Sequence, residues 1–250
     1  MKKENRHQVI LHNVSIHNRV LLSDLSQLLN VSIDTVRRDV VELHIQGKLK
    51  KVHGGAIANG FQFKQNVSND EIYAAECKHI IAEKAVQLIK NDQVILISGG
   101  TTNLELVKRL PLKLRATFFT PSLPIALELM SHPTVEVILI GGKLSKDSQV
   151  SMGGYAINML SDIKADLCFL GTGYMDTSNG LTEFDWEVVQ IKKAMIRSSK
   201  KVISLTISEK LNSHQKYKIC QLQEINTLIT ELDGDNELLT PYKRMINTIL

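Results

Sequence analysis

Hydroxyl, guanidinium and ammonium side chains crowd a short stretch near the start of the chain. They are Ser32, Thr35, Arg37 and Arg38, followed by Lys48, Lys50, Lys51 and His53. An Arg side chain can donate two parallel hydrogen bonds to a guanine edge, while Ser and Thr hydroxyls contact phosphates or base edges. Lysines add attraction to phosphate that does not depend on sequence. This chemistry predicts a nucleic-acid-binding surface; the competing interpretation is a solvated basic face.

A second set of residues follows short apolar runs farther along the chain. Its members are small, carry hydroxyl or amide groups, or are basic: Ser98, Gly99, Gly100, Thr101, Thr102, Asn103, Gly141, Gly142, Lys143, Gly171 and Lys210. Glycines allow close backbone approach, hydroxyls and free N–H groups donate hydrogen bonds, and Lys143 or Lys210 supplies a counter-charge. The set predicts a phosphate site, although a glycine-rich loop alone also fits a structural tight turn.

Three helices are expected to position the first set. Apolar residues at helical spacing predict them over Glu4 to about Val14, Asp24–Leu29, and Ile33 to about Gln46. Ser23 and Ser32 are expected to cap the second and third helices, and Gly47 to end the third. The apolar stripe of the third helix consists of Ile33, Val36, Val40 and Leu43. A tight turn between a short helix and a longer, Arg-bearing one is typical of a helix-turn-helix.

The residues after the third helix form a basic segment that ends in two glycines. Leu49 and Val52 alternate with lysines before Gly54 and Gly55. This pattern predicts a short β-wing that grips the DNA backbone or minor groove. Asp39 is expected to be a structural partner instead, because an exposed carboxylate would repel phosphate.

Charge is distributed unevenly along the 250 residues. Residues 1–60 hold nine Lys and Arg against five Asp and Glu, whereas the remaining residues hold 21 of each sign. A basic segment joined to a larger neutral one indicates a polyanion-binding module with a second domain. The residue composition, 43% hydrophobic and 22% charged, is that of a globular protein.

Several classes of protein are not expected. The apolar runs are a few residues long, against the roughly 20 that a membrane span needs, and the N-terminus does not resemble a secretion signal. The three scattered cysteines favour a reducing, cytoplasmic location and argue against a disulfide framework. His79, His132 and His214 form no metal-spaced pair, so neither a metal nor a cofactor is expected.

Helical and strand-like stretches alternate through the second half. Apolar strands are expected over Gln93–Ile97, Ala116–Phe119, Val135–Ile140, Asp166–Leu170, Val202–Leu205 and Thr227–Thr230. Helices are expected over Glu76–Ile89, Leu104–Leu110, Pro124–Met130, Ala156–Ile163, Trp186–Arg197 and near Pro241–Leu250. This alternation predicts an α/β domain with a mostly parallel sheet, in which ligands bind at the carboxyl edge. The expected organisation is a winged helix-turn-helix over 1–57, a linker over 58–75 and an α/β domain over 76–250.

The segment from Ser32 to Val40 reads S-I-D-T-V-R-R-D-V, with Leu43, Gly47, Leu49 and Val52–Ala56 following in register. It resembles the signature of DeoR-type bacterial transcriptional regulators, with Lys51 where the family usually has Arg. Lys51 keeps the charge but lacks the planar fork. The resemblance implies a DNA-binding protein that recognises an operator as a homo-oligomer, a dimer or a tetramer.

The resemblance extends over nearly the whole chain. Its further matches are Gly100-Thr101-Thr102, Gly141-Gly142, Gly153, Phe169-Leu170-Gly171, Gly180-Leu181-Thr182, Lys193-Ala194-Met195 and Lys210. The DeoR-type effector domain is similar to the ribose-5-phosphate isomerase and CoA-transferase-like fold. This similarity implies a phosphorylated sugar as the effector.

Some positions depart from that pattern. Ser98 stands for an Asp, Asn103 for a third Thr, and Ile207 for the Asp before Lys210. Gly173 replaces the first acid that related isomerases use for proton transfer, and glycine cannot serve as a base. Asp176 and Glu183 remain as candidate acceptors for sugar hydroxyls.

The expected function is therefore a DNA-binding repressor of sugar-metabolism genes, released when its second domain binds a phosphorylated sugar. Two alternatives stay open. One is a sugar-phosphate isomerase-like enzyme with a DNA-binding module. The other is a regulator with a different ligand or none.

Overall fold

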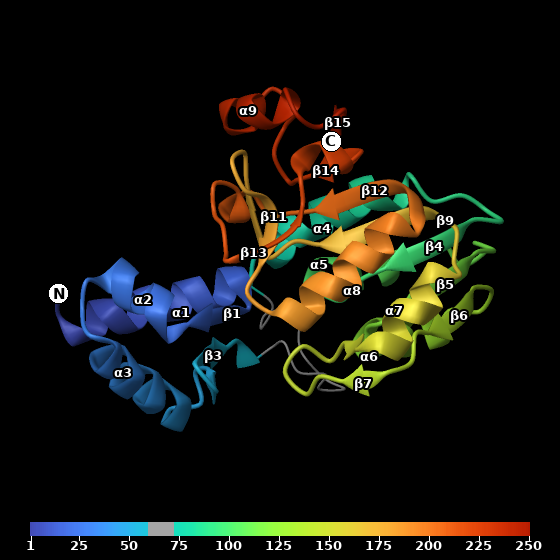
Figure 1. Cartoon of the computed structure of the whole chain (residues 1–250). Coiled ribbons are helices and arrows are strands. Elements are labelled where there is room, and N and C mark those ends of the chain that lie inside the picture. Colours follow the sequence, from blue (N-terminus) through green and yellow to red (C-terminus); the bar gives the residue numbers. More distant parts are fainter. Residues whose placement is uncertain (60–72) are drawn as a thin grey trace. The chain divides into compact units, whose positions relative to one another are not determined.

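The structure, a computed structural model, describes residues 1–59 and 73–250 (Figure 1). The chain divides into two compact units, Met1–Tyr73 and Ala74–Leu250. Residues 60–72, which contain most of the predicted linker over 58–75, lie outside the described residues.

Three helices form most of the first unit: α1 (Lys3–His17), α2 (Leu22–Leu29) and α3 (Ile33–Ile45). Their shared core includes Ile10, Leu25, Val36, Val40 and Leu43. Two expectations are wrong. Ser23 is not a cap, because α2 begins one residue earlier and the Ser23 hydroxyl donates to Asp24. Ile33 is 44% exposed, because it occupies the first turn of α3, beyond the reach of the core.

The wing forms a three-stranded antiparallel sheet from β1 (Arg19–Leu21), β3 (Gly55–Ile57) and β2 (Lys50–Val52), in that order. The sequence did not predict β1, which is a short polar–apolar segment between two helices. β1 runs so close to β3 that a Cβ on Gly55 would lie 2.1 Å from the Val20 carbonyl oxygen. Glycine at position 55 therefore allows β3 to pair with β1, the strand between α1 and α2.

A charged cluster joins α1 to α3. The Arg6 guanidinium donates to both carboxylate oxygens of Asp39, at 2.7 and 3.0 Å, and His7 Nε2 lies 3.2 Å from Asp39 Oδ1. Burial disfavours the ionised carboxyl, but the Arg6 and His7 interactions outweigh it and lower the pKa of Asp39. Asp39 is thus the structural partner that its position predicted.

The second unit contains a seven-stranded sheet in which all neighbouring strands are parallel. Its order is β15 (Thr248–Ile249), β14 (Thr227–Ile229), β12 (Ser199–Leu205), β9 (Ala165–Gly171), β4 (Val94–Ile97), β5 (Thr117–Thr120) and β6 (Glu136–Leu139). The predicted parallel α/β architecture is confirmed.

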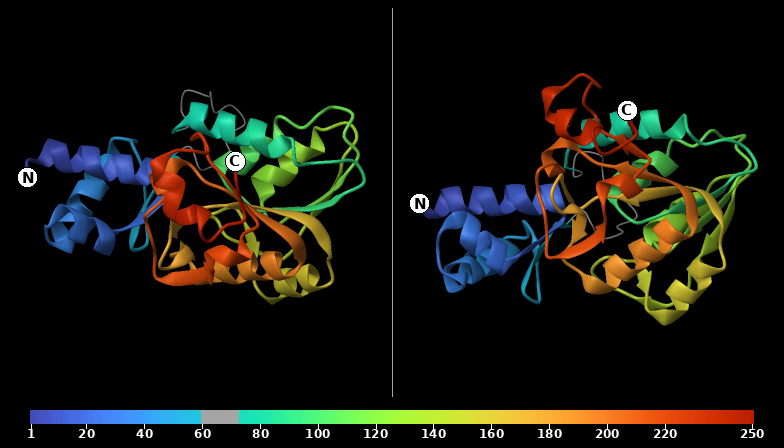
Figure 2. Two further views of the ribbon diagram at one scale, coloured as in Figure 1. Left: turned by 90° about the horizontal axis from the view of Figure 1, so that it is seen from above. Right: turned by 45° about the horizontal axis from the view of Figure 1, so that its top comes forward.

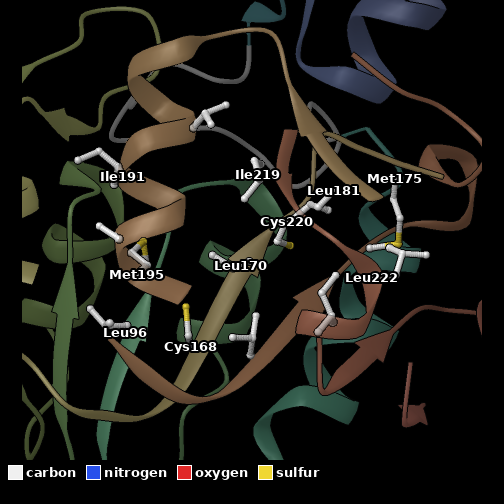
Figure 3. Packing of buried hydrophobic residues seen from close by; sticks show 14 of the residues in the cluster. Leu96, Cys168, Leu170, Met175, Leu181, Ile191, Met195, Ile219, Cys220 and Leu222 are labelled. Carbon is white, nitrogen blue, oxygen red and sulfur yellow. The ribbon is translucent and has the colours of Figure 1, made fainter. Parts of the chain in front are cut away.

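Helices cover both faces of this sheet (Figure 2). One face carries α4 (Ala75–Val86), α5 (Thr101–Val107) and α6 (Leu123–Met130), and the other carries α7 (Gly154–Ser161) and α8 (Trp186–Arg197). Figure 3 shows Ile191 and Met195 of α8 in the core with Leu96, Cys168 and Leu170 of the sheet. Because the strand order reverses between β4 and β9, the helices of the crossovers before the reversal and those after it lie on opposite faces.

Other elements depart from the prediction. A second sheet, β10 (Tyr174–Asp176), β11 (Gly180–Glu183) and β13 (Tyr217–Cys220), is antiparallel, and β7 (Lys143–Leu144) pairs with β8 (Ser151–Met152). The predicted C-terminal helix is only α9 (Thr240–Lys243). The chain then forms β15, because pairing with β14 satisfies the final backbone groups. Trp186 is 56% exposed at the start of α8, where its ring meets that of Tyr217 edge-on.

None of the helices formed by the described residues combines the length and apolar character needed to cross a bilayer.

Asp39→Asn is expected to destabilise the first unit by about 1–3 kcal/mol, because Arg6 and His7 would lose their ionised partner. Since the folded-state pKa of Asp39 is lowered, the difference should be present at pH 7 and should vanish as pH falls through that pKa. Hydrogen exchange of α1 and α3 amides in the full chain would measure it. Asp34→Asn, which breaks an exposed pair with Arg37, is the control; an equal loss in both variants would contradict the prediction.

Candidate nucleic-acid interface and anion site

The first turn of α3 is organised by its cap. Ser32 Oγ accepts the Thr35 N–H at 3.3 Å and lies 2.9 Å from the Thr35 hydroxyl. Both hydroxyls lie at the exposed or half-exposed N-terminus of the helix, where backbone N–H groups also favour anions. The cap predicted from the sequence is confirmed.

The two arginines of α3 differ in their surroundings. Arg37 is ion-paired with Asp34 one turn earlier. Arg38 is exposed, and within the described part of the chain no hydrogen bond or ion pair occupies it. Arg38 can therefore engage a base without giving up a partner, whereas Arg37 must exchange Asp34 for DNA.

The basic residues of the wing are accessible. Lys48, Lys51 and His53 are exposed, and Lys50 is half-buried on β2. The intervening Leu49 is 1% exposed and belongs to the core of the unit. This alternation holds the lysines on the outside of the winged helix-turn-helix.

At the carboxyl edge of the large sheet, the loops after β4 and β9 nearly touch. A Cβ on Gly171 would lie 2.5 Å from the Gly99 carbonyl oxygen, so a side chain would force the loops apart. Ser98 Oγ accepts the Gly171 N–H at 2.8 Å. Gly99, Gly100 and Thr101 belong to the same turn into α5, and Thr102 is buried in its first turn.

Asn103 is completely buried behind this loop. Its amide nitrogen donates to the Ser98 carbonyl at 2.7 Å and approaches Ser98 Oγ at 3.1 Å. Its Oδ1 has no hydrogen-bond partner among the described residues. Because an unsatisfied buried acceptor costs free energy, Asn103 is suited to accept a hydrogen bond from a bound molecule.

Three buried lysines converge on the same edge from different elements. Lys78 lies on α4, Lys192 on α8 and Lys210 in the turn after β12, with exposed fractions of 3, 8 and 6%. Lys192 Nζ donates to the Gly171 carbonyl and to Glu183 Oε2, both at 3.0 Å, and Lys210 Nζ donates to the Thr172 carbonyl at 2.8 Å. We call these three residues the lysine cluster.

Burial makes positive charge costly in the lysine cluster. Burial lowers the pKa of Lys210 to about 7, assisted by the charges of Lys78 and Lys192 and opposed by Glu183. Burial likewise lowers the pKa of Lys78 to about 8. An anion bound here would offset the repulsion and restore the charged form of both lysines. This environment can hold a phosphate.

The Glu183 carboxylate lies beside Gly173. A Cβ on Gly173 would lie 3.3 Å from Glu183 Oε2, so the Glu183 carboxylate fills the space beside the glycine. Its other oxygen accepts the Phe184 N–H at 3.1 Å, and Lys192 holds Oε2. Glu183 is thus a paired carboxylate with remaining acceptor capacity.

Other predicted residues do not join these groups. Lys143 lies on β7 with its side chain 71% exposed and pairs with Glu187 at 3.3 Å. Gly141 and Gly142 form the turn before β7, and a Cβ on Gly142 would meet the Met152 carbonyl oxygen at 2.7 Å. Asp176 accepts the Ser178 N–H and the Asn179 side chain, both at 2.8 Å, and therefore closes the β10–β11 turn.

Sequence reasoning missed Lys78 and Lys192. Lys78 shares the helical spacing of the buried residues Ile81, Ala82 and Ala85, and Lys192 lies between the buried Val189 and Met195. A lysine in register with an apolar stripe is the signal that could have identified both. Elsewhere in the described ranges, no three His, Cys, Asp or Glu side chains gather as metal ligands.

Both units match family models. The first matches the DeoR-like helix-turn-helix domain over residues 6–61, and the second matches the DeoR C terminal sensor domain over residues 74–232.

Relatives align over nearly the full length. The HTH-type transcriptional regulator GolR of Listeria innocua is 34% identical over 227 residues, covering 90% of this chain and 89% of that protein. The HTH-type transcriptional repressor GlcR of Bacillus subtilis is 32% identical over 232 residues, covering 92 and 89%. The lactose phosphotransferase system repressor of Streptococcus mutans is 29% identical over 254 residues, covering 99 and 100%.

Among solved structures, ribose 5-phosphate isomerase A of Methanocaldococcus jannaschii is 17% identical with a TM-score of 0.41, covering 58% of this chain and 55% of that one. Because both domain models match and two relatives exceed 30% identity over most of their length, this chain belongs to the DeoR family of DNA-binding helix-turn-helix transcriptional regulators.

Proposed function

We propose that this regulator represses sugar-metabolism genes and leaves its operator when a phosphorylated sugar binds beside the lysine cluster. The observation that carries the proposal is the burial of three lysines at the carboxyl edge of the sheet, where Lys192 is ion-paired with Glu183. A phosphate would add negative charge beside Lys210, whose pKa is lowered by burial and by the charges of Lys78 and Lys192. The name of the Streptococcus mutans relative, a repressor of a lactose phosphotransferase system, supports a sugar-linked ligand.

The neighbouring groups suit the sugar portion. Asn103 Oδ1 and the Glu183 carboxylate can accept hydrogen bonds from hydroxyls, and the Ser98 hydroxyl lies between the two loops. The Ser98 hydroxyl already accepts a hydrogen bond from the Gly171 N–H. Its proposed role is therefore to join the loops after β4 and β9 as well as to contact the ligand. Lys143 and Asp176, which are paired elsewhere, are not part of this proposed site.

Release from DNA follows from linkage. The effector must bind the DNA-incompetent arrangement more tightly, by the same factor as operator affinity falls. We propose a homo-oligomer whose helix-turn-helix units occupy half-sites about 34–36 Å apart, or a multiple of this spacing. A change in the separation of these units would then prevent simultaneous docking.

The proposed site binds without turnover. Proton transfer needs a base within hydrogen-bond reach of the substrate carbon. Gly173 supplies none, and Glu183 is held by Lys192 and the Phe184 N–H. Turnover of a sugar phosphate that disappears in Glu183→Gln would overturn this part of the proposal.

The central experiment has two stages. Genomic DNA fragments bound by the protein are selected to identify the operator, and operator affinity is then measured across a panel of sugar phosphates and inorganic phosphate. At least one sugar phosphate should weaken operator binding about tenfold or more, the lower part of the usual range of allosteric coupling. Unchanged affinity across the panel would refute sugar-phosphate control.

Arg38→Ala is expected to weaken operator binding about 10–100-fold, with a smaller loss on unrelated DNA, because an unpaired Arg at this position can read a base. Arg37→Ala should cost less, since Arg37 must first leave Asp34. Titration of labelled operator and scrambled DNA would measure both losses. The control is Arg115→Ala, which removes an exposed Arg from the other unit; equal losses on both DNAs would mean that Arg38 contacts only phosphate.

Lys192→Met and Lys210→Met should each reduce effector binding at least about tenfold, because each removes a charge from the proposed phosphate site. Lys143→Met is the matched control, since this lysine is exposed and paired with Glu187. Isothermal titration with the sugar phosphate that weakens operator binding would measure the change. Loss in Lys143→Met alone would place the phosphate elsewhere.

The lysine cluster also predicts how stability depends on pH. Because the folded-state pKa values of Lys210 and Lys78 are lowered to about 7 and 8, the unfolded chain binds more protons than the folded chain above pH 7. The contribution of these lysines to unfolding free energy should therefore rise from about pH 7 towards 10.5, the ordinary pKa of a lysine. Urea unfolding should show this slope in the wild type and a smaller slope in Lys210→Met. An identical slope in the two proteins would contradict the assignment.

A further inference from the structure

A cavity of about 470 Å³ lies at the opposite, amino edge of the parallel sheet. It opens where α7 and α8 end and where β9 and β12 begin. Its lining consists of Ile157, Ser161, Ile163, Lys164, Ala165, Ala194, Arg197, Ser198, Ser199 and Lys200. The cavity shares no residue with the lysine cluster and is therefore a separate site from the proposed effector site.

The inner part of the cavity is apolar and well anchored. Ala165 and Ala194 are 0 and 4% exposed, and their small side chains leave space between α7 and α8. The Ala165 N–H donates to the Ser198 carbonyl at 2.8 Å, and the Ser198 hydroxyl donates to the Leu160 carbonyl at 2.6 Å. These long-range bonds join β9, α7 and the end of α8, so the hollow is part of the packed framework.

The remainder of the lining is basic. Lys200 pairs with Asp166 at 2.8 Å, whereas Arg197 and Lys164 are exposed and have no ion pair or hydrogen-bond partner among the described residues. Asp162 is the other nearby acid, at the end of α7. The carbonyl ends of α7 and α8 favour cations, which explains why Arg197 is stable at this position.

We propose that this cavity binds a small amphipathic anion: an aromatic or aliphatic body on the alanine and isoleucine side chains, with a carboxylate, sulfonate or phosphate against Arg197 and Lys164. Its volume lies within the roughly 300–1,000 Å³ typical of small-molecule sites. An apolar interior with a few cations at one side provides burial for the body and orientation for the head group. The hollow between two helix ends favours a compact molecule over an extended acidic peptide.

The test compares two probes on the full chain. 8-Anilinonaphthalene-1-sulfonate is an aromatic sulfonate, and N-phenyl-1-naphthylamine is the same body without the charged group. Fluorescence titration should show stoichiometric, saturable binding of the sulfonate. Arg197→Gln/Lys164→Gln should weaken the sulfonate at least about tenfold and the neutral probe less than about twofold, because only the head-group contact is lost.

Matched variants exclude charge and folding effects. Arg115→Gln/Lys113→Gln removes the same charge from exposed positions outside the cavity and should leave both affinities unchanged. Ser161→Trp adds bulk at an exposed lining position and should weaken both probes. Circular dichroism confirms that each variant is folded.

Three results would overturn the proposal: no saturable sulfonate binding by the wild type, equal binding by the Arg197/Lys164 variant, or equal losses in both charge variants. Sedimentation of the same samples tests a second copy of the chain as occupant. Dissociation of an oligomer in the Arg197/Lys164 variant, without sulfonate binding by the wild type, would assign this surface to self-association instead.

Discussion

The sensor unit is organised around the cost of burying three ammonium groups at one edge of a parallel sheet. An isolated buried charge is strongly unfavourable unless it is paired, hydrogen-bonded or neutralised. The cluster meets this constraint with Glu183, the Gly171 and Thr172 carbonyls and the lowered pKa values of Lys78 and Lys210. The close approach of the β4 and β9 loops, which requires Gly171, supplies those carbonyls in the correct place. A bound anion would relieve the same cost, so binding is coupled to the stability of this edge.

The first unit follows a different physical rule. Its core is small, and the groups that we propose to contact DNA lie outside that core on α3 and the wing. Two sets of interactions position these groups. Asp39 pairs with Arg6 and so joins α3 to α1, and β1 pairs with β3 of the wing, where Gly55 allows the close approach. The exposed arginines then differ only in their local partner, since Asp34 engages Arg37.

The long helix α8 links two chemically distinct regions of the sensor unit. Lys192 reaches the carboxyl edge, whereas Ala194 and Arg197 line the cavity at the amino edge. The buried side chains of α8, including Ile191 and Met195, pack on the sheet between these regions (Figure 3). One packed core therefore connects the two regions through α8.

The sequence alone determined the features that depend on a few neighbouring residues. Ser32 capped α3 because its hydroxyl needs only the Thr35 N–H, and alternating apolar runs specified a parallel sheet because periodicity is local. Only tertiary structure decided which loops and side chains meet. It brought Lys78, Lys192 and Lys210 together from three elements, while Lys143 paired with Glu187 and Asp176 closed a turn. It also converted the final residues into β15, since pairing with β14 outweighed their helical pattern. These outcomes depend on packing between residues that are far apart in the sequence. Spacing and residue type indicate such packing only where a lysine lies in register with an apolar stripe, as Lys78 and Lys192 do.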